Sequence, residues 1–292
     1  MLESATAHST QASYSQGMKC YDDFVSYFEL EKIWPPTLDY IVQFIGFMSV
    51  RNLAQKTAKL YVAGISYHLK LGNHLDLTQN FLVRKLLEGY RRKVSTHDSR
   101  MPITLDLLEK LLLILPLVCY NDYEVKLFSA AYSMAFFGFF RVGELTGGSH
   151  HNTNHSVRFQ DVELFTKHGK LRIILKHSKT DQEGRGEIVI IENDKFHSSI
   201  RPVSIISDYL NVRPEVPGIL FCHYGGQPLT RVQFTAVLHK AIMALGLDST
   251  KFKSHSFRIG AATTAAMLGF SEDEICRAGR WKSKSYQTYI RK

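Results

Sequence analysis

Residues 171–192 read LRIILKHSKTDQEGRGEIVIIE, and this stretch decides the fold class of the chain. Two runs rich in isoleucine, leucine and valine flank a polar turn that contains glycine, which is typical of a β-hairpin. On both sides of the stretch, apolar residues recur with the period of an α-helix. The sequence therefore predicts a mainly α-helical protein with a small antiparallel β-sheet.

The first part of the chain has the pattern of a helical domain. One helix is expected to end before Pro35, one to begin behind Thr37, one to cover residues 52–72 and one residues 77–94. The polar stretch 95–102, STHDSRMP, breaks the pattern and predicts a linker. We therefore predict two domains, residues 1–97 and 98–292. Expected buried positions in the first domain include Phe24, Tyr27, Phe28, Leu30, Ile41, Phe44, Ile45, Met48, Leu53, Leu60, Ile65 and Leu69.

The second domain is also expected to be mostly helical. Helices are predicted over residues 104–116, 230–245 and 256–270, and residues 121–146 predict one long buried helix. The hairpin lies between the second and third of these segments in chain order, so the small sheet is an insertion among helices.

Composition narrows the possible partners. The chain has 292 residues, 45% of them hydrophobic, and a net charge of +9, which favours a nucleic acid first and a membrane surface second. Its apolar runs are too short to span a bilayer, and its first residues lack the apolar core of a secretory signal. Four scattered cysteines without a Cys-x-x-Cys pair indicate reduced thiols in a cytosolic or nuclear protein.

Several common types of site are missing from the sequence. It contains neither a glycine-rich phosphate loop nor a Gly-x-Ser-x-Gly motif. His150, His151 and His155 offer a possible metal-ligand spacing, but the neighbouring Gly147, Gly148 and asparagines favour an exposed loop. We therefore predict no metal site.

Basic residues at unusual positions provide the functional signal. Arg141 follows the apolar run AFFGFF and precedes Glu144, which could orient its guanidinium, although a purely structural ion pair would look the same. Arg258 stands near the start of an alanine-rich helix, three residues after His255, and Lys179 lies in the hairpin turn. Together with a late tyrosine, these residues could perform phosphate transfer without a metal.

These motifs resemble those of the tyrosine recombinase (phage integrase) family, and the resemblance covers nearly the whole chain. The matching stretches are GFFRVGELT (138–146), HSKTDQ (177–182), HSFRIGAAT (255–263), GRW (279–281) and YIR (289–291). The ending is most similar to recombinases of eukaryotic mobile elements of the Crypton and DIRS/Ngaro types and to Cre-like enzymes. The resemblance implies six catalytic residues and an orienting one: Arg141, Lys179, His255, Arg258, Trp281 and Tyr289, with Glu144 orienting Arg141.

The resemblance also implies a fold and an activity. The first domain would be a SAM-like core-binding domain that binds DNA, and the second would be the catalytic domain. The protein would be a site-specific strand transferase that cuts and rejoins double-stranded DNA through a 3′-phosphotyrosyl intermediate. It would need no cofactor, would act as a dimer or tetramer on DNA without membrane contact, and would be nuclear in a eukaryote and otherwise cytoplasmic.

Two other functions share these features. One is a domesticated, catalytically silent DNA-binding protein derived from such a recombinase, and the other is a type IB topoisomerase. The presence of Tyr289 and both arginines favours the active enzyme, and the compact helical first domain argues against the topoisomerase.

The nucleophile could be either of two tyrosines. Tyr289 lies eight residues after Trp281, one residue short of the usual family interval, whereas Tyr286 lies only five residues after it. Tyr289 is therefore predicted to attack the DNA, and Tyr286 to pack one turn earlier on the same side of a helix.

Basic residues of the first domain are the candidates for DNA contacts. They cluster in the third and fourth predicted helices, where an ordinary solvated helix face is the alternative. The candidates are Lys56, Lys59, Arg91, Arg92 and Lys93.

Overall fold

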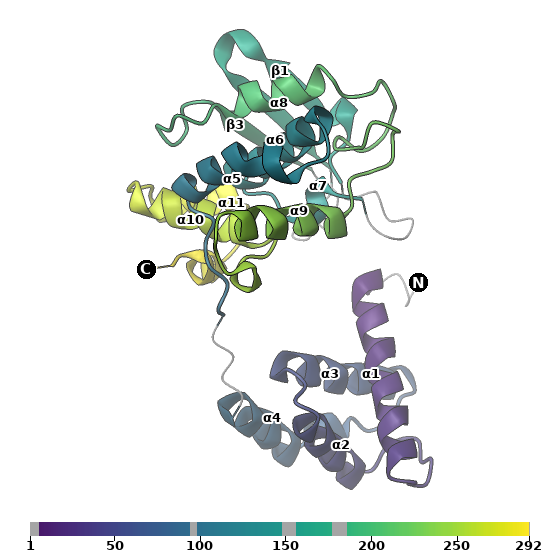
Figure 1. Ribbon diagram of the computed structural model, residues 1–292. Helices are drawn as coiled ribbons and strands as arrows, with labels where there is room; N and C mark the ends of the chain where they lie inside the picture. Colours follow the sequence, from purple (N-terminus) through teal and green to yellow (C-terminus); the bar gives the residue numbers. More distant parts are fainter. Residues whose placement is uncertain (1–5, 94–97, 148–155, 177–185, 292) are drawn as a thin grey trace. The chain divides into compact units, whose positions relative to one another are not determined.

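The computed structural model describes residues 6–93, 98–147, 156–176 and 186–291. The chain divides into two compact units, Met1–Asp98 and Ser99–Lys292 (Figure 1). The division falls inside the predicted linker, one residue from the predicted boundary. Each unit has its own hydrophobic core.

Unit 1 is entirely helical in the part that the structure describes. Thr37 caps α2 by accepting a hydrogen bond from the backbone N–H of Tyr40, as its sequence position predicts. One face of each long helix packs into the core, which includes Phe24, Phe44 and Ile65. The elements are α1 (His8–Tyr27), α2 (Leu38–Val50), α3 (Gln55–Leu71), the 3₁₀ helix η2 (Leu77–Gln79) and α4 (Phe81–Lys93).

Three of the predicted core positions in unit 1 are wrong. Tyr27, Phe28 and Leu60 are 65%, 52% and 37% exposed. The helix α1 ends at Tyr27, so Tyr27 and Phe28 lie at its open end. In α3 the buried face follows Ala58, Val62, Ile65 and Leu69 at helical spacing, which turns Leu60 toward solvent.

Unit 2 surrounds a small sheet with helices. Figure 1 shows α6 and α8 beside the sheet, and both helices contact β3. Its elements are α5 (Leu105–Val118), α6 (Asp122–Phe137), α7 (Val142–Leu145), η4 (Phe159–Asp161), β1 (Val162–Phe165), η5 (Thr166–His168), β2 (Lys170–Leu175), β3 (Glu187–Glu192), α8 (Pro202–Leu210), α9 (Arg231–Ala244), η6 (Ser249–Lys251), α10 (Ser256–Met267), α11 (Glu272–Gly279) and η7 (Lys284–Tyr289).

The sheet confirms the predicted hairpin and adds a strand to it. β2 and β3 pair antiparallel from Lys170 opposite Glu192 to Leu175 opposite Glu187. The third strand, β1, pairs with β2, so the order is β1-β2-β3. Sequence patterning missed β1 because this strand has only four residues and none of them is fully buried.

The predicted long helix over residues 121–146 is in fact interrupted. α6 ends at Phe137, Gly138 caps it, and Phe139 has a left-handed backbone with φ of 51°. The chain then starts again as α7, with Arg141 immediately before it. This break puts Arg141 at a helix start instead of within a helix.

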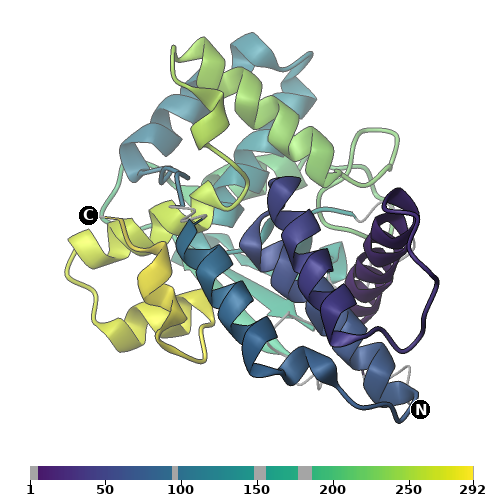
Figure 2. The ribbon, with the colours of Figure 1, turned by 90° about the horizontal axis from the view of Figure 1, so that it is seen from below.

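Helix α10 packs unusually close to the start of unit 2. A Cβ atom on Gly260 would lie 1.7 Å from the carbonyl oxygen of Ile103. The backbone N–H of Ile103 also donates to the Ser256 carbonyl at 3.0 Å. In Figures 1 and 2, α10, α11 and the C-terminal segment lie together at the yellow end of the colour scale.

Two further features bear on the sequence predictions. Among the described residues, none of the helices combines the length and apolarity needed to cross a membrane. All four cysteines are free thiols, and only Cys222 is fully buried.

Candidate active site

A shared carboxylate lies at the centre of the predicted site. Glu144 is 4% exposed, and its Oε1 accepts a hydrogen bond from Arg141 Nη1 at 2.9 Å. Its Oε2 accepts from the Arg141 backbone N–H at 2.9 Å and from Arg280 Nη2 at 2.8 Å. Glu144 therefore holds two guanidinium groups, and only the first was expected from the sequence.

Arg258 is the most deeply buried cation of the site. It is 1% exposed, and its two terminal nitrogens donate to the carbonyl oxygens of Phe139 and Gly279. Its guanidinium carbon lies 4.2 Å from the Trp281 ring centre and 5.6 Å from that of Tyr289. Burial, and then the charge of Arg141, lowers the pKa of Arg258, which nevertheless remains a cation at neutral pH. A phosphate can reach it only after the covering side chains move.

His255 immediately precedes α10 and is surrounded by arginines. Burial lowers the pKa of its imidazole to about 4, followed by the charges of Arg100, Arg231, Arg258 and Arg141. The imidazole is therefore neutral at physiological pH, when it can accept a proton.

The two candidate tyrosines have different surroundings. The Tyr289 ring lies 5.0 Å from that of Trp281 and close to Arg258. Tyr286 is 3% exposed, and a hydrogen bond with Glu272 of α11 raises its pKa. Both belong to the 3₁₀ helix η7, not to an α-helix. Their contacts correct the expectation that they point the same way: Tyr289 lies against the cations, and Tyr286 lies against α11.

Trp281 packs against both Arg258 and Tyr289. The tryptophan is 9% exposed, and a Cβ atom on Gly279 would lie 1.7 Å from its ring. Glycine at position 279 thus lets the indole lie directly on the backbone whose carbonyl binds Arg258. The structure therefore brings together Arg141, Glu144, His255, Arg258, Trp281 and Tyr289, all within unit 2.

Some predicted residues lie outside the described part of the chain. Lys179 is one of them, and so are His150, His151 and His155. In the residues that are described, no cluster of three or more histidine, cysteine, aspartate or glutamate side chains is arranged to hold a metal ion.

Sequence reasoning missed three arginines of the site. Arg280 binds Glu144 directly, and the charges of Arg100 and Arg231 act on His255. Arg280 is the middle residue of the GRW motif, next to Trp281, so the sequence did contain an indication that Arg280 belongs to the site. Arg231 begins α9 and Arg100 precedes α5, and neither position has a pattern that would connect it with His255.

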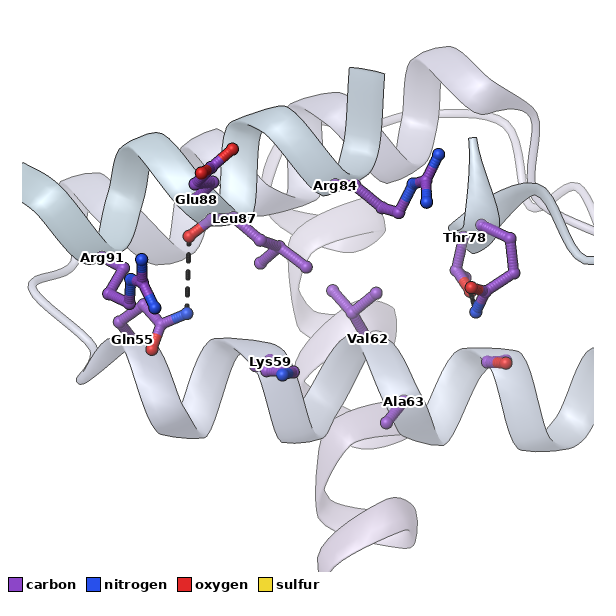
Figure 3. Close-up of a pocket in the computed structure, with 11 residues that line it drawn as sticks. Gln55, Lys59, Val62, Ala63, Thr78, Arg84, Leu87, Glu88 and Arg91 are labelled. Atoms are coloured by element: carbon purple, nitrogen blue, oxygen red, sulfur yellow. Dashed lines mark hydrogen bonds between the residues drawn. The ribbon is translucent and has the colours of Figure 1, made fainter. Parts of the chain in front are cut away.

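Unit 1 contains a separate basic pocket of about 450 Å³ between α3 and α4. Figure 3 shows Lys59 on α3 and Arg84 and Arg91 on α4 among its lining residues. Gln55 bridges the two helices at one end by donating to the Leu87 carbonyl at 3.4 Å. Of the five predicted DNA contacts, Lys59 and Arg91 line this pocket, whereas Lys56, Arg92 and Lys93 are exposed outside it. Arg84 was not predicted.

A comparison with known proteins found a relative in sequence. An integrase/recombinase XerD homolog of Selenomonas ruminantium is 26% identical over 304 residues, covering 99% of this chain and 83% of that protein. No model of a known protein family matches the sequence.

Solved structures share the fold. The XerH site-specific recombinase bound to its difH substrate superposes with a TM-score of 0.66 at 14% identity, over 96% of this chain and 75% of the other. The Tn1549 transposon integrase in complex with circular intermediate DNA gives 0.65 at 12% identity, over 98% and 91%. A lambda integrase dimer bound to a COC′ core site gives 0.65 at 15%, over 98% and 72%.

The fold is the one that these recombinases and integrases share. In sequence the chain resembles an integrase/recombinase homolog, and in fold it resembles site-specific recombinases and integrases. A particular affinity to the Crypton or DIRS/Ngaro types stays a prediction.

Proposed function

We propose that this protein cuts and rejoins double-stranded DNA at specific sites through a 3′-phosphotyrosyl link to Tyr289. The observation that carries the proposal is the position of Tyr289 against Arg258 and Trp281, in the same site as Arg141 and a neutral His255. A phosphodiester is an anion, and paired guanidinium groups match its oxygens.

The reaction follows from the chemistry of these side chains. The Tyr289 oxygen forms a bond to phosphorus while the bond to the 5′ oxygen breaks. Because a phenol has a pKa near 10, its proton must leave during attack, and the neutral His255 can assist. Arg141 and Arg258 stabilise charge on the non-bridging oxygens, and Lys179 protonates the departing 5′ oxygen. Rejoining reverses these steps on a second strand.

The binding role is assigned to unit 1. Lys59, Arg84 and Arg91 would contact phosphates from the pocket between α3 and α4, and Lys56, Arg92 and Lys93 would add charge around it. The functional form would be a dimer or tetramer on DNA, nuclear in a eukaryotic host and otherwise cytoplasmic.

Covalent trapping on a nicked suicide substrate tests the proposal. The wild-type protein should form a protein–DNA adduct that resists denaturant, and Tyr289→Phe should form none while binding DNA with unchanged affinity. Tyr286→Phe is the matched control and should retain the adduct, because its hydroxyl lies toward Glu272. An adduct lost in Tyr286→Phe and kept in Tyr289→Phe would reverse the two roles. A wild-type protein that binds DNA without any adduct would favour the catalytically silent alternative.

Removal of metal ions gives a second, independent test. Guanidinium groups supply the positive charge at the phosphate, and the phosphotyrosyl link conserves the energy of the broken bond. Adduct formation should therefore proceed at the same rate in EDTA and without any nucleotide. An absolute requirement for Mg²⁺ would contradict the roles of Arg141 and Arg258.

A further inference from the structure

Arg280 occupies a position that is costly for an arginine. It follows α11 in the left-handed backbone conformation, with φ of 57° and ψ of 43°. L-residues other than glycine rarely adopt this conformation, since their Cβ approaches the carbonyl oxygen. The Arg280 side chain is also only 5% exposed, so its charge has been removed from water. A residue with two such costs must be held by specific contacts.

Those contacts reach three separate segments of unit 2. Arg280 Nη2 donates to Glu144 Oε2 of α7 at 2.8 Å. Its Nη1 donates to the Gly138 carbonyl at 3.0 Å, and its Nη2 also reaches the Phe139 carbonyl at 3.3 Å. Its Nε lies 3.5 Å from Glu187 Oε2, at the start of β3. The guanidinium carbon lies 4.9 Å from the Phe140 ring centre.

We propose that Arg280 is a positioning residue for DNA cleavage, which sets the orientation of Arg141 through Glu144 and that of Arg258 through the Phe139 carbonyl. This inference rests on the proposed function. The Arg280 guanidinium is bound by Glu144, by two backbone carbonyls and by Glu187, so it acts through these neighbours.

Arg280 acts on Arg141 through Glu144. Arg280 and the Arg141 backbone occupy Oε2, which leaves Oε1 for a single bond to Arg141 Nη1. Without Arg280, Glu144 could bind Arg141 with both oxygens, since carboxylates favour this paired geometry. Arg141 would then be drawn away from the phosphate, and its charge would be more fully neutralised. Arg280 thus keeps Arg141 available.

Arg280 also contacts the turn between α6 and α7. The Phe139 carbonyl accepts from both Arg258 Nη1 and Arg280 Nη2. Phe139 has a left-handed backbone, so this turn depends on its contacts to stay in place. Arg280 fixes the carbonyl to which Arg258 is bound, and Arg280 is also the chain neighbour of Trp281, which covers Arg258.

Single-turnover cleavage of the suicide substrate provides the test. Arg280→Gly removes the guanidinium while suiting the left-handed backbone. We expect the cleavage rate to fall about 10- to 100-fold, the usual cost of losing an orienting partner, with DNA affinity unchanged. Arg277→Ala is the matched control, because Arg277 lies in the last turn of α11, three residues before Arg280, and donates to the Asp273 carbonyl instead of to Glu144; its rate should equal that of the wild type.

A double-mutant cycle separates positioning from a merely structural role. If Arg280 acts through Glu144, the fold-loss in cleavage rate caused by Arg280→Gly should be at least ~5-fold smaller in a Glu144→Gln background than in the wild-type background. Equal fold-losses in both backgrounds would indicate general destabilisation and overturn the inference. A cleavage rate of Arg280→Gly within about twofold of the wild-type rate would also overturn the inference, because the expected loss is larger.

Arg280→Lys keeps the test decisive if Arg280→Gly fails to fold. A lysine retains the cation beside Glu144, but its ammonium cannot span Glu144 and two carbonyls as the planar guanidinium does. We still expect cleavage at least about 10-fold slower, and a wild-type rate would overturn the inference. If the wild-type protein forms no adduct, both the proposed function and this role of Arg280 are wrong. If the protein cleaves DNA but substitution of Arg280 does not change the rate, only this role is wrong.

Discussion

At the scale of single residues, the candidate site contains more cationic than anionic side chains. Arg141 and Arg280 pair with the deeply buried carboxylate of Glu144, and Arg280 also lies near the partly exposed Glu187. Arg258 donates to backbone carbonyls instead. Binding of an anion to such a site is favourable, because it relieves the repulsion among the guanidinium groups. Burial first, and then the positive charge around it, lowers the pKa of His255 and keeps its imidazole neutral.

The neutrality of His255 predicts how protein stability depends on pH. Its folded pKa of about 4 lies below the ordinary value of 6.5. Above pH 6.5 the His255 imidazole is neutral in both the folded and the unfolded protein. As pH falls toward 4, the imidazole takes up a proton in the unfolded protein but stays neutral in the folded protein. Stability should therefore decrease over this range. His255→Asn should lose less stability than the wild type between pH 7 and pH 5, by on the order of 1 kcal/mol after allowing for solvent screening.

Urea denaturation of both proteins at the two pH values measures this difference. The other histidines contribute equally to the two proteins, so they cancel in the comparison. An identical loss of stability in wild type and His255→Asn would show that the imidazole is protonated normally in the fold.

Sequence patterns indicated candidate site residues more readily than the contacts between them. The expected pair of Arg141 and Glu144 is three residues apart, and their contact follows from that spacing. The bond between Arg280 and Glu144 joins residues 136 positions apart, which no local pattern could indicate. The covering of Arg258 by Trp281 also depends on the tertiary fold. Charge type and spacing are local properties, whereas the sharing of a carboxylate is not.

At the scale of secondary-structure elements, helix starts were predictable and helix breaks were less so. Thr37, Thr104 and Thr230 cap α2, α5 and α9 through their side chains, as their sequence positions favour. The break after α6 was missed because the residues around Gly138 are as apolar as the helix before it. Burial of Phe139 and Phe140 on both sides of the turn removes the helical periodicity that would mark an end.

The approach of α10 to the start of unit 2 predicts a sensitive glycine. Gly260→Ala would place a Cβ 1.7 Å from the Ile103 carbonyl oxygen, so the backbone must shift. We expect the free energy of unfolding to fall by at least about 2 kcal/mol. Gly143→Ala in α7 is the control, since nothing lies within 4 Å of the added Cβ, and alanine favours a helix.

Thermal or urea unfolding of the two variants distinguishes them. Gly143→Ala should be as stable as the wild type or slightly more stable. If Gly260→Ala matches it, α10 can move away from Ile103 freely, and the close packing described above does not constrain the site.

At the scale of the whole molecule, the proposed function assigns DNA binding and cleavage to separate units of the chain. The pocket of unit 1 contributes Lys59, Arg84 and Arg91, whereas every described catalytic candidate belongs to unit 2. Phosphate contacts contribute affinity, and the cations at the reacting phosphate contribute rate. The two contributions should therefore be separable by mutation.

Alanine at Lys59, Arg84 and Arg91 together tests this division of roles. Each cation that neutralises a phosphate adds about 0.9 to the slope of log affinity against log salt, so the slope should decrease by about 2.7. The cleavage rate at saturating DNA should stay at the wild-type value, because none of the three side chains belongs to the unit that holds Tyr289. Alanine at Lys19, Lys70 and Lys85 removes the same charge from unit 1 outside the pocket and is the matched control. If both triple variants change the slope equally, net charge and not the pocket controls binding. If the pocket variant also slows cleavage at saturation, unit 1 takes part in the chemical step as well as in holding the DNA.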